Sequence, residues 1–143
     1  MTIACDLCDS QGGALLFEGA GYRVVLVDDA DYPGFCRVIW NAHVKEMSDL
    51  DGADRVTLMA AVWEVEAALR AVMQPEKINV ASLGNMTPHV HWHVIPRYLD
   101  DAHFPSPVWA AAQRASAPLA LEQRRAKLPA LCSEIVRRFD ALR

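Results

Sequence analysis

The stretch TPHVHWHVIPR, residues 87–97, places histidines at positions 89, 91 and 93 with bulky apolar residues between them. The chain has only five histidines, so three of them fall within five consecutive positions. Side chains alternate between the two faces of a β-strand, and a strand here presents all three imidazoles on one face. We expect this strand to be accessible at a sheet edge, with the histidines facing a cleft and Val90, Trp92 and Val94 facing the core.

Three imidazoles on one strand face are open to more than one interpretation. Neighbouring histidines of the pattern lie about 6.6 Å apart at their Cα atoms, and the outer two lie about 13 Å apart. Two of them can therefore reach one metal ion, whereas all three on a straight strand cannot easily do so. A neutral imidazole is also a good nucleophile toward phosphorus, and its neighbours can orient it or transfer a proton. The remaining interpretation is exposed strand histidines without a chemical role.

The apolar pattern of the whole chain predicts an α+β fold, with an antiparallel sheet of about five strands, one long helix and a C-terminal helical segment. Strands are expected at residues 15–18, 22–27, 35–40, 77–83 and 89–95. The first three form a predicted meander, and the last two form an antiparallel pair. A helix is expected at residues 55–73, where an apolar stripe ends before Pro75; the stripe consists of Leu58, Val62, Val65, Leu69 and Val72. A second stripe at residues 128–142 predicts the C-terminal helix.

Size and composition limit the possible classes of protein. A chain of 143 residues, 52% hydrophobic and 22% charged, suits one globular domain. The net charge of −4 provides no basic field for nucleic acid or an anionic membrane surface, so neither partner is expected. The N-terminus lacks the features of a signal peptide, and no apolar run reaches the ~18 residues of a membrane span. We therefore predict a cytoplasmic protein whose cysteines are reduced thiols or metal ligands; they are Cys5, Cys8, Cys36 and Cys132.

The sequence resembles the histidine-triad (HIT) family, whose signature His-φ-His-φ-His-φ-φ, with φ apolar, here reads His-Val-His-Trp-His-Val-Ile. The resemblance covers residues 4–98 and includes Pro33-Gly34 and Ala42-His43-Val44. GNMTPHVHWHVIPR with DDAHFPSPVW looks closest to bacterial members described as diadenosine-tetraphosphate-hydrolase-like. The resemblance implies a single HIT-like domain over residues 1–143, with a C-terminal helical extension at 118–143, and a homodimer.

The same resemblance implies hydrolysis or transfer at the α-phosphate of a small-molecule nucleotide conjugate, either a dinucleoside polyphosphate or a nucleoside phosphoramidate. His91 would be the nucleophile that carries a covalent nucleotidyl group, His89 would orient it, and His93 would hydrogen-bond the phosphate or leaving group. No cofactor would be required for catalysis. Asn85 would contact phosphate and Asp28 would accept the ribose hydroxyls. The alternative interpretations are a turn residue for Asn85 and a solvated loop carboxylate for Asp28.

One residue departs from the family pattern. Phe35 follows Pro33-Gly34 at a position where several members carry a further histidine. This difference puts in doubt any mechanism that needs a fourth active-site imidazole. Two other functions also stay open: a nucleotide-binding module with little turnover, and a metal-dependent hydrolase that uses two of the triad imidazoles.

Cys5 and Cys8 form a C-x-x-C pair, a spacing typical of zinc ligands. Several HIT members combine such a pair with a histidine after the third strand and with the first triad histidine. The resemblance thus implies a structural Cys2His2 zinc site formed by Cys5, Cys8, His43 and His89. A reduced thiol pair in the N-terminal segment is the alternative.

Three further residues that could contribute to a site follow the triad in the chain; they are Arg97, His103 and Trp109. Arg97 is expected either to reach a phosphate or to lie in solvent at the end of the strand. His103 is expected at the surface. Trp109 is expected either to close the site or to cover the core.

Overall fold

In the computed structural model, residues 4–142 are described and form an α+β fold on one antiparallel sheet, which confirms the predicted fold class. The strands are β1 (Ala14–Glu18), β2 (Tyr22–Leu26), β3 (Cys36–Trp40), β4 (Lys77–Ala81) and β5 (His91–Arg97). The helices are α1 (Asp6–Asp9), α2 (Gly52–Met73), α3 (Pro118–Arg125) and α4 (Leu128–Asp140), with a 3₁₀ turn at Met47–Asp49. The predicted domain limits of 1–143 also include residues 1–3 and 143, which lie outside the described residues.

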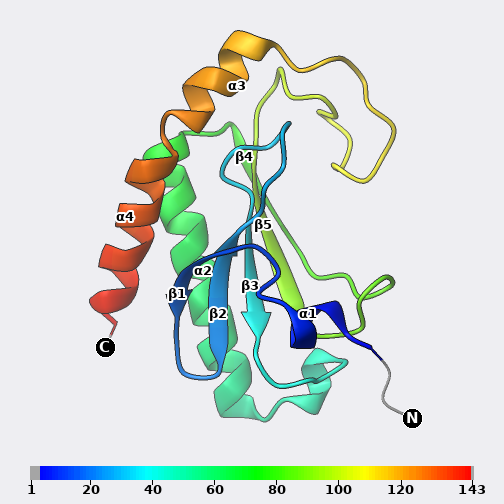
Figure 1. Ribbon diagram of the computed structural model, residues 1–143, viewed down its shortest axis with the longest axis vertical. Helices are drawn as coiled ribbons and strands as arrows, with labels where there is room; N and C mark the ends of the chain where they lie inside the picture. The colour runs from blue at the N-terminus through cyan, green and yellow to red at the C-terminus, as the bar shows by residue number, and fades with distance from the viewer. Residues whose placement is uncertain (1–3, 143) are drawn as a thin grey trace.

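The five strands follow the order β1-β2-β3-β5-β4, and every neighbouring pair is antiparallel (Figure 1). This order confirms the predicted meander and the predicted pairing of the last two strands. The expectation of an edge strand for the histidines is wrong, because β5 lies between β3 and β4 and pairs with both. The histidines of β5 are therefore reached from a face of the sheet and not from its edge.

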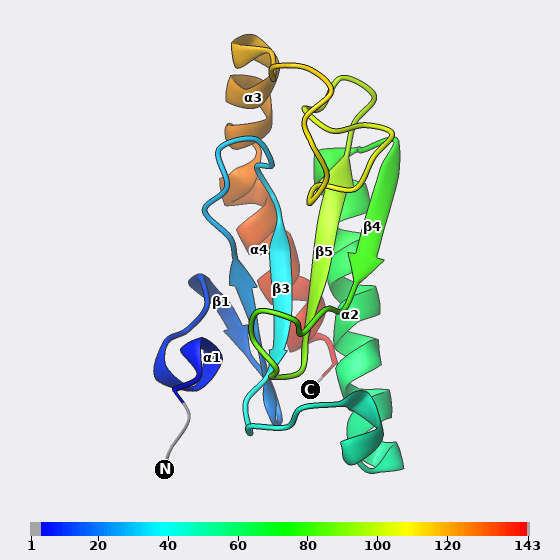
Figure 2. The same cartoon turned by 90° about the vertical axis from the view of Figure 1, so that its right-hand side faces the viewer.

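Helices α2 and α4 pack against each other on one face of the sheet (Figure 2). The predicted stripe of α2 lies in the main core, where Leu58, Val62, Val65 and Leu69 are fully buried. Alternate residues of the strands meet this stripe, and α4 adds its own apolar side chains; they include Val24, Val38, Val94, Leu131, Ile135 and Phe139. The two helices thus leave only the opposite face of the sheet available for a site.

The ends of the helices follow from local signals. Helix α2 begins at Gly52, three residues before its predicted start, because the Asp51 carboxylate accepts a hydrogen bond from the Asp54 amide at 2.8 Å. It ends at Met73, and Gln74 then adopts a left-handed conformation with φ of 49°. The C-terminal extension contains two helices, α3 and α4, of which the apolar pattern predicted only α4. Helix α3 has no buried residue, so its sequence shows no clear apolar stripe.

Strand β5 begins at His91, two residues later than predicted. The His89 amide donates to the carbonyl of Thr87 at 2.8 Å, and the Val90 amide donates to the carbonyl of Val44 at 2.8 Å. These bonds draw the chain toward the segment after β3 before the ladder of β5 starts. His89 consequently lies outside the strand.

The N-terminal segment covers part of the sheet face that α2 and α4 leave free. Cys5 and Leu7 pack there with Val25 of β2 and Ile39 of β3 in a small separate core. Arg23 fastens the segment, since its guanidinium donates to the Leu7 carbonyl at 2.6 Å. Among residues 4–142, no helix has the length and apolar character needed to cross a bilayer.

Candidate functional site

A cleft of about 770 Å³ lies beside the N-terminal segment on this face of the sheet. His91 and His93 both line the cleft, while Trp92 and Val94 pack on the opposite side against the main core. The alternation predicted for the strand is therefore confirmed for these four residues. The backbone of His93 is paired with both β3 and β4, whereas the ladder pairs His91 with β3, and the His91 carbonyl accepts a hydrogen bond from the Ser82 hydroxyl at 2.7 Å.

The ring of His91 is oriented by a backbone carbonyl. Its Nδ1 lies 2.6 Å from the carbonyl oxygen of His89, so Nδ1 carries the proton and donates it. The other ring nitrogen, Nε2, then keeps its lone pair. Burial lowers the pKa of His91, the hydrogen bond to His89 opposes this effect, and the charge of Arg37 lowers the pKa further. The outcome is a neutral imidazole with one free nitrogen, which is the form that attacks phosphorus.

His93 is surrounded by aromatic rings. Its ring centroid lies 4.9 Å from that of His91, 5.6 Å from Phe35 and 5.1 Å from Trp109. Burial, followed by the charges of His91 and Arg37, lowers the pKa of His93 to about 4. Its Nδ1 is buried and makes no hydrogen bond among the described residues. Phe35 thus forms an apolar wall beside a neutral His93.

The side chain of His89 does not join the other two imidazoles in the cleft. It is 1% exposed, and its Nε2 lies 2.5 Å from the carbonyl oxygen of Trp40. Its Nδ1 lies 3.4 Å from Sγ of Cys5 and 3.5 Å from Sγ of Cys8. His89 therefore contributes its carbonyl to His91 and its ring to a second cluster.

The second cluster contains the four residues of the predicted zinc site. One ligand atom from each of Cys5, Cys8, His43 and His89 lies within 4.8 Å of the others. Zn–S bonds of about 2.3 Å and Zn–N bonds of about 2.0 Å require tetrahedral donors roughly 3.3–3.8 Å apart. The separations of 3.4 and 3.5 Å between imidazole nitrogen and sulfur agree with that requirement. The contact of the His89 Nε2 with Trp40 is the kind of outer hydrogen bond that orients a metal-binding imidazole.

The two predicted substrate-binding residues occupy different places. Asn85 is exposed in the link between β4 and β5 and lines the same cleft as His91 and His93. Asp28 is exposed after the end of β2 and lines a separate cleft of about 660 Å³. The two clefts share Gly13 in their walls, so they adjoin along the N-terminal segment.

Arg37 is a cleft residue that the sequence interpretation missed. It lies on β3 as the Cα partner of His93, and its Nη1 donates to the carbonyl of Gly12 at 3.0 Å. The alternation of β3 could have revealed it, because Cys36, Val38 and Trp40 face the main core. Arg37 must then project to the opposite face with the histidines.

Of the two roles expected for Trp109, covering the core is wrong, and closing the site stays a prediction. Its side chain is 52% exposed and lines the cleft next to His93. An indole in this position provides an apolar surface at the mouth of the cleft.

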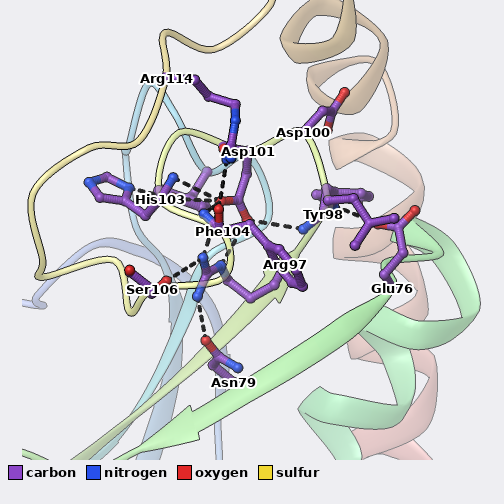
Figure 3. Close-up of polar contacts among 12 residues, drawn as sticks. Glu76, Asn79, Arg97, Tyr98, Asp100, Asp101, His103, Phe104, Ser106 and Arg114 are labelled. Atoms are coloured by element: carbon purple, nitrogen blue, oxygen red, sulfur yellow. Dashed lines mark hydrogen bonds and ion pairs between the residues drawn. The ribbon is translucent and has the colours of Figure 1, made fainter.

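Both expectations for Arg97 are wrong, because its guanidinium is only 2% exposed and reaches neither the cleft nor solvent. Figure 3 shows its contacts with Asp101, Asn79 and Ser106. Nε and Nη2 donate to the two Asp101 carboxylate oxygens at 2.8 and 3.1 Å, while Nη1 donates to the Asn79 side chain at 2.6 Å. Arg97 is thus a structural cation that fixes the loop after β5.

His103, expected at the surface, belongs to the same cluster. Its ring is half-buried, with its centroid 5.7 Å from that of Tyr32, and its Nδ1 lies 2.6 Å from the Tyr32 hydroxyl. The Asp101 carboxylate also accepts from the backbone amides of His103 and Phe104. These contacts join the loop after β5 to the loop between β2 and β3.

Comparisons with known proteins agree with the fold and the triad. The HIT domain family matches residues 12–100. The AP-4-A phosphorylase of Mycobacterium tuberculosis strain H37Rv is 31% identical over an alignment of 78 residues that covers 50% of this chain and 40% of that protein. The match thus spans less than half the length of this curated relative.

Two solved structures are similar over nearly their whole length. A histidine triad protein from Bradyrhizobium japonicum is 26% identical with a TM-score of 0.72, and the alignment covers 90% of this chain and 91% of that one. A histidine triad protein from Marinobacter aquaeolei VT8 is also 26% identical, with a TM-score of 0.68 and coverage of 87% and 92%.

Proposed function

Because the chain belongs to the HIT domain family, whose match supports a nucleotide-processing activity, we propose that His91 attacks the α-phosphorus of a nucleotide conjugate. The observation that carries this proposal is the hydrogen bond from Nδ1 of His91 to the His89 carbonyl, 2.6 Å long, which leaves Nε2 free. The His91 ring also lines a cleft large enough for a nucleotide.

The reaction proceeds in two displacements. The lone pair of the His91 Nε2 forms an N–P bond while the bond from phosphorus to the leaving group breaks, and its electron pair goes to the leaving atom. Water then attacks the phosphorus, the N–P bond breaks, and its electron pair returns to Nε2 of His91. The proton that the water loses passes to solvent. An acceptor other than water in the second displacement makes the same site a transferase.

Other cleft residues assist the two displacements. The amide of Asn85 donates to a phosphate oxygen, and His93 donates a hydrogen bond to the phosphate or to the leaving group. Asp28 accepts the ribose hydroxyls if the nucleoside extends from the histidine cleft into the neighbouring one. We propose a homodimeric cytoplasmic protein that acts on a small nucleotide. The name of the curated relative favours a dinucleoside polyphosphate, and a nucleoside phosphoramidate is the other candidate substrate.

The test of this mechanism is the covalent intermediate. The protein is mixed with a dinucleoside tetraphosphate, quenched during turnover and digested, and the peptides are searched by mass spectrometry for an acid-labile nucleotidyl group on His91. We expect the adduct in the wild type and its loss in His91→Ala. Turnover by the wild type without any adduct, together with full activity of His91→Ala, would show that an activated water is the nucleophile.

Two experiments separate the other functions. A nucleotide-binding module binds the substrates of both classes without converting them, so the same mixing experiment shows binding and no product. A metal-dependent hydrolase loses its activity when a chelator removes the metal. We expect turnover to survive chelation, because no step at His91 requires a metal ion.

We further propose that Cys5, Cys8, His43 and His89 hold a structural zinc ion. Four nitrogen and sulfur donors at these separations suit a closed tetrahedral site, and the bound ion would link the N-terminal segment to the chain before β5. Metal binding to a folded site adds directly to folding free energy. Purified protein should contain about one zinc ion per chain.

The zinc proposal is tested by substitution of one ligand. Cys8→Ser should lose the metal and unfold at a lower temperature, whereas the matched control Cys132→Ser should keep it, because Cys132 lies on α4. Metal-free protein of unchanged thermal stability would reject the site. That result would leave the His91 mechanism intact.

A further inference from the structure

Arg37 carries a positive charge into the cleft and forms no ion pair with any carboxylate of residues 4–142. The ion pairs found among residues 4–142 involve other arginines; they are Arg97, Arg124, Arg137 and Arg138. Asp6 on α1 also lines the cleft, but it is exposed and forms no ion pair with Arg37 within the described chain. A half-buried guanidinium without a counter-charge favours the binding of an anion.

Most of the hydrogen-bonding capacity of Arg37 is free. A guanidinium has five N–H donors, and Nη1 uses one of them on the carbonyl of Gly12. The Nε atom is buried and has no partner among the described residues. The single bond to Gly12 fixes the direction of the side chain along the cleft wall while several donors stay available for a ligand.

The strand register places this charge directly opposite His93, whereas the nucleophile lies one row further along the sheet. Arg37 is the Cα partner of His93, whereas Ile39 is the partner of His91. Side chains of directly opposed residues project to the same face, with Cβ atoms about 4.5–5.5 Å apart. The guanidinium carbon lies 5.9 Å from the ring centroid of Phe35, which itself contacts His93. Arg37 and His93 therefore form one end of the cleft, and His91 lies on the next row of the sheet.

A fixed cation at this end assists the departure of a phosphate more than the departure of an amine. A phosphate departs as an anion, and positive charge stabilises the oxygen that receives the electron pair of the breaking P–O bond. An amine must instead gain a proton when the P–N bond breaks, and an arginine does not give up its proton near neutral pH. His93 is a poor proton source as well, because its burial, with the charge of Arg37 nearby, lowers its pKa to about 4 and leaves it unprotonated near neutral pH.

We propose that Arg37 binds the anionic phosphate of the leaving group and thereby selects nucleotides that release phosphate, such as dinucleoside polyphosphates, over nucleoside phosphoramidates. This inference rests on the proposed function. While Nε2 of His91 forms its bond to the α-phosphorus, the P–O bond to the leaving phosphate breaks and its electron pair goes to the leaving oxygen. The free N–H groups of Arg37 hydrogen-bond that phosphate, and water later releases the nucleotide from His91.

The first test compares turnover of two substrates. We expect Arg37→Met to lower kcat/KM for a dinucleoside tetraphosphate by about 10- to 100-fold, the usual effect of a lost charge-assisted hydrogen bond. Turnover of a nucleoside phosphoramidate should fall at least tenfold less. Arg37→Lys should restore part of the lost activity, because it keeps the charge without the planar array of donors. The matched control is Arg70→Met, which removes an exposed arginine on α2.

The second test measures binding and does not depend on turnover. Calorimetric titration with adenosine monophosphate and adenosine diphosphate separates the α-phosphate from the next phosphate. Arg37→Met should weaken the diphosphate by about 10- to 100-fold and the monophosphate much less. Equal weakening of both nucleotides, or of neither, would overturn the assignment of Arg37 to the leaving group.

The two tests also distinguish this inference from the proposed function. If the wild type converts both substrates and Arg37→Met slows both equally, the selection by Arg37 is wrong while the His91 mechanism stands. If the wild type converts neither substrate, the proposed function fails, and the binding comparison alone then decides whether Arg37 is an anion site.

Discussion

The face of β5 that looks away from α2 carries a different site at each end. At one end, His91 and His93 line an open cleft in which Arg37 donates a hydrogen bond to a backbone carbonyl. At the other end, Arg97 is 2% exposed and has a carboxylate, an amide side chain and a backbone carbonyl as partners. Both ends hold an arginine on the same sheet face, separated along β5 by the buried Ile95.

The difference between the two arginines distinguishes a structural charge from a charge prepared for a ligand. The hydrogen bonds of Arg97 are supplied by the protein itself, so its role is complete in the folded chain. Arg37 is only half-buried and lines the cleft, and its buried Nε has no hydrogen-bond partner among the described residues. The first arginine should therefore matter for stability, and the second for the choice of substrate.

The largest expected effect lies at the open end of β5. His91→Ala should lower turnover by more than about 10⁴-fold, since removal of a nucleophile disables the whole catalytic group. The variant should still bind nucleotide, and its free energy of unfolding should change far less than its activity. Steady-state kinetics and urea denaturation on the same preparation measure both quantities. Comparable losses of stability and activity would mean that this end of β5 is structural too.

At the closed end we expect a loss of stability. Asp101→Asn removes the charge that balances Arg97 in a buried pair, and such a change typically costs about 3–5 kcal/mol of unfolding free energy. Asp100→Asn is the matched control, because its ion pair with Arg124 is 56% exposed on the Asp100 side and should contribute about 0–1 kcal/mol. Chemical denaturation of the two variants gives the comparison. Equal, small losses would contradict the structural role of Arg97.

The two ends should respond to acid in different pH ranges. The pKa of His93 is lowered from 6.5 to about 4, so the unfolded chain binds more protons than the folded one and stability falls as pH drops from about 6.5 toward 4. Burial alone raises the pKa of Asp101, but hydrogen bonds from Arg97 and from backbone amides outweigh it and hold that pKa well below its usual value. The stability that Asp101 supplies is therefore present above about pH 4 and is lost below it.

Unfolding free energies measured from pH 7 to pH 2.5 test this separation. His93→Gln should flatten the upper part of the profile, and Asp101→Asn should flatten the lower part. A single transition shared by both variants would show that the two ends of β5 titrate as one unit.

The smallest expected effect tests whether the nucleotide-binding surface extends from the histidine cleft into the neighbouring cleft that Asp28 lines. If a nucleoside reaches the neighbouring cleft, Asp28→Ala should raise KM by about tenfold or less through the loss of hydrogen bonds to the ribose. A substrate with a 2′,3′-dideoxyribose should show no such change. Equal effects of Asp28→Ala on both substrates would show that Asp28 does not bind the ribose hydroxyls.

The sequence was sufficient to predict those features that depend on local periodicity. Alternation along β5 and the stripe of α2 depend only on side-chain geometry within one element, and the structure confirms both. The start of β5 depends on a hydrogen bond between Val90 and Val44, which lies far away along the chain, so the strand was predicted two residues too early.

The surroundings of Arg37 and Arg97 could not be predicted for a similar reason. Alternation on β3 places Arg37 on the correct face, but only the register against β5 makes it the neighbour of His93. Arg97 was expected near phosphate or solvent because a lone arginine at a strand end gives no sign of its partner. The loop that follows folds back and brings Asp101 onto the guanidinium.

The contact of His89 with the N-terminal segment also sets an order of assembly. Cys5 and His89 are 84 residues apart in the chain, and their contact can form only when the strands between them are in place. Once the sheet has formed, docking must still order the residues before β1, and α1, with only four residues, forms few contacts of its own to offset that loss of entropy. We therefore expect the N-terminal segment to dock last and to detach first. Amide hydrogen exchange should show Cys8 and Asp9 exchanging through a local opening while the amides of β3 and β5 stay protected.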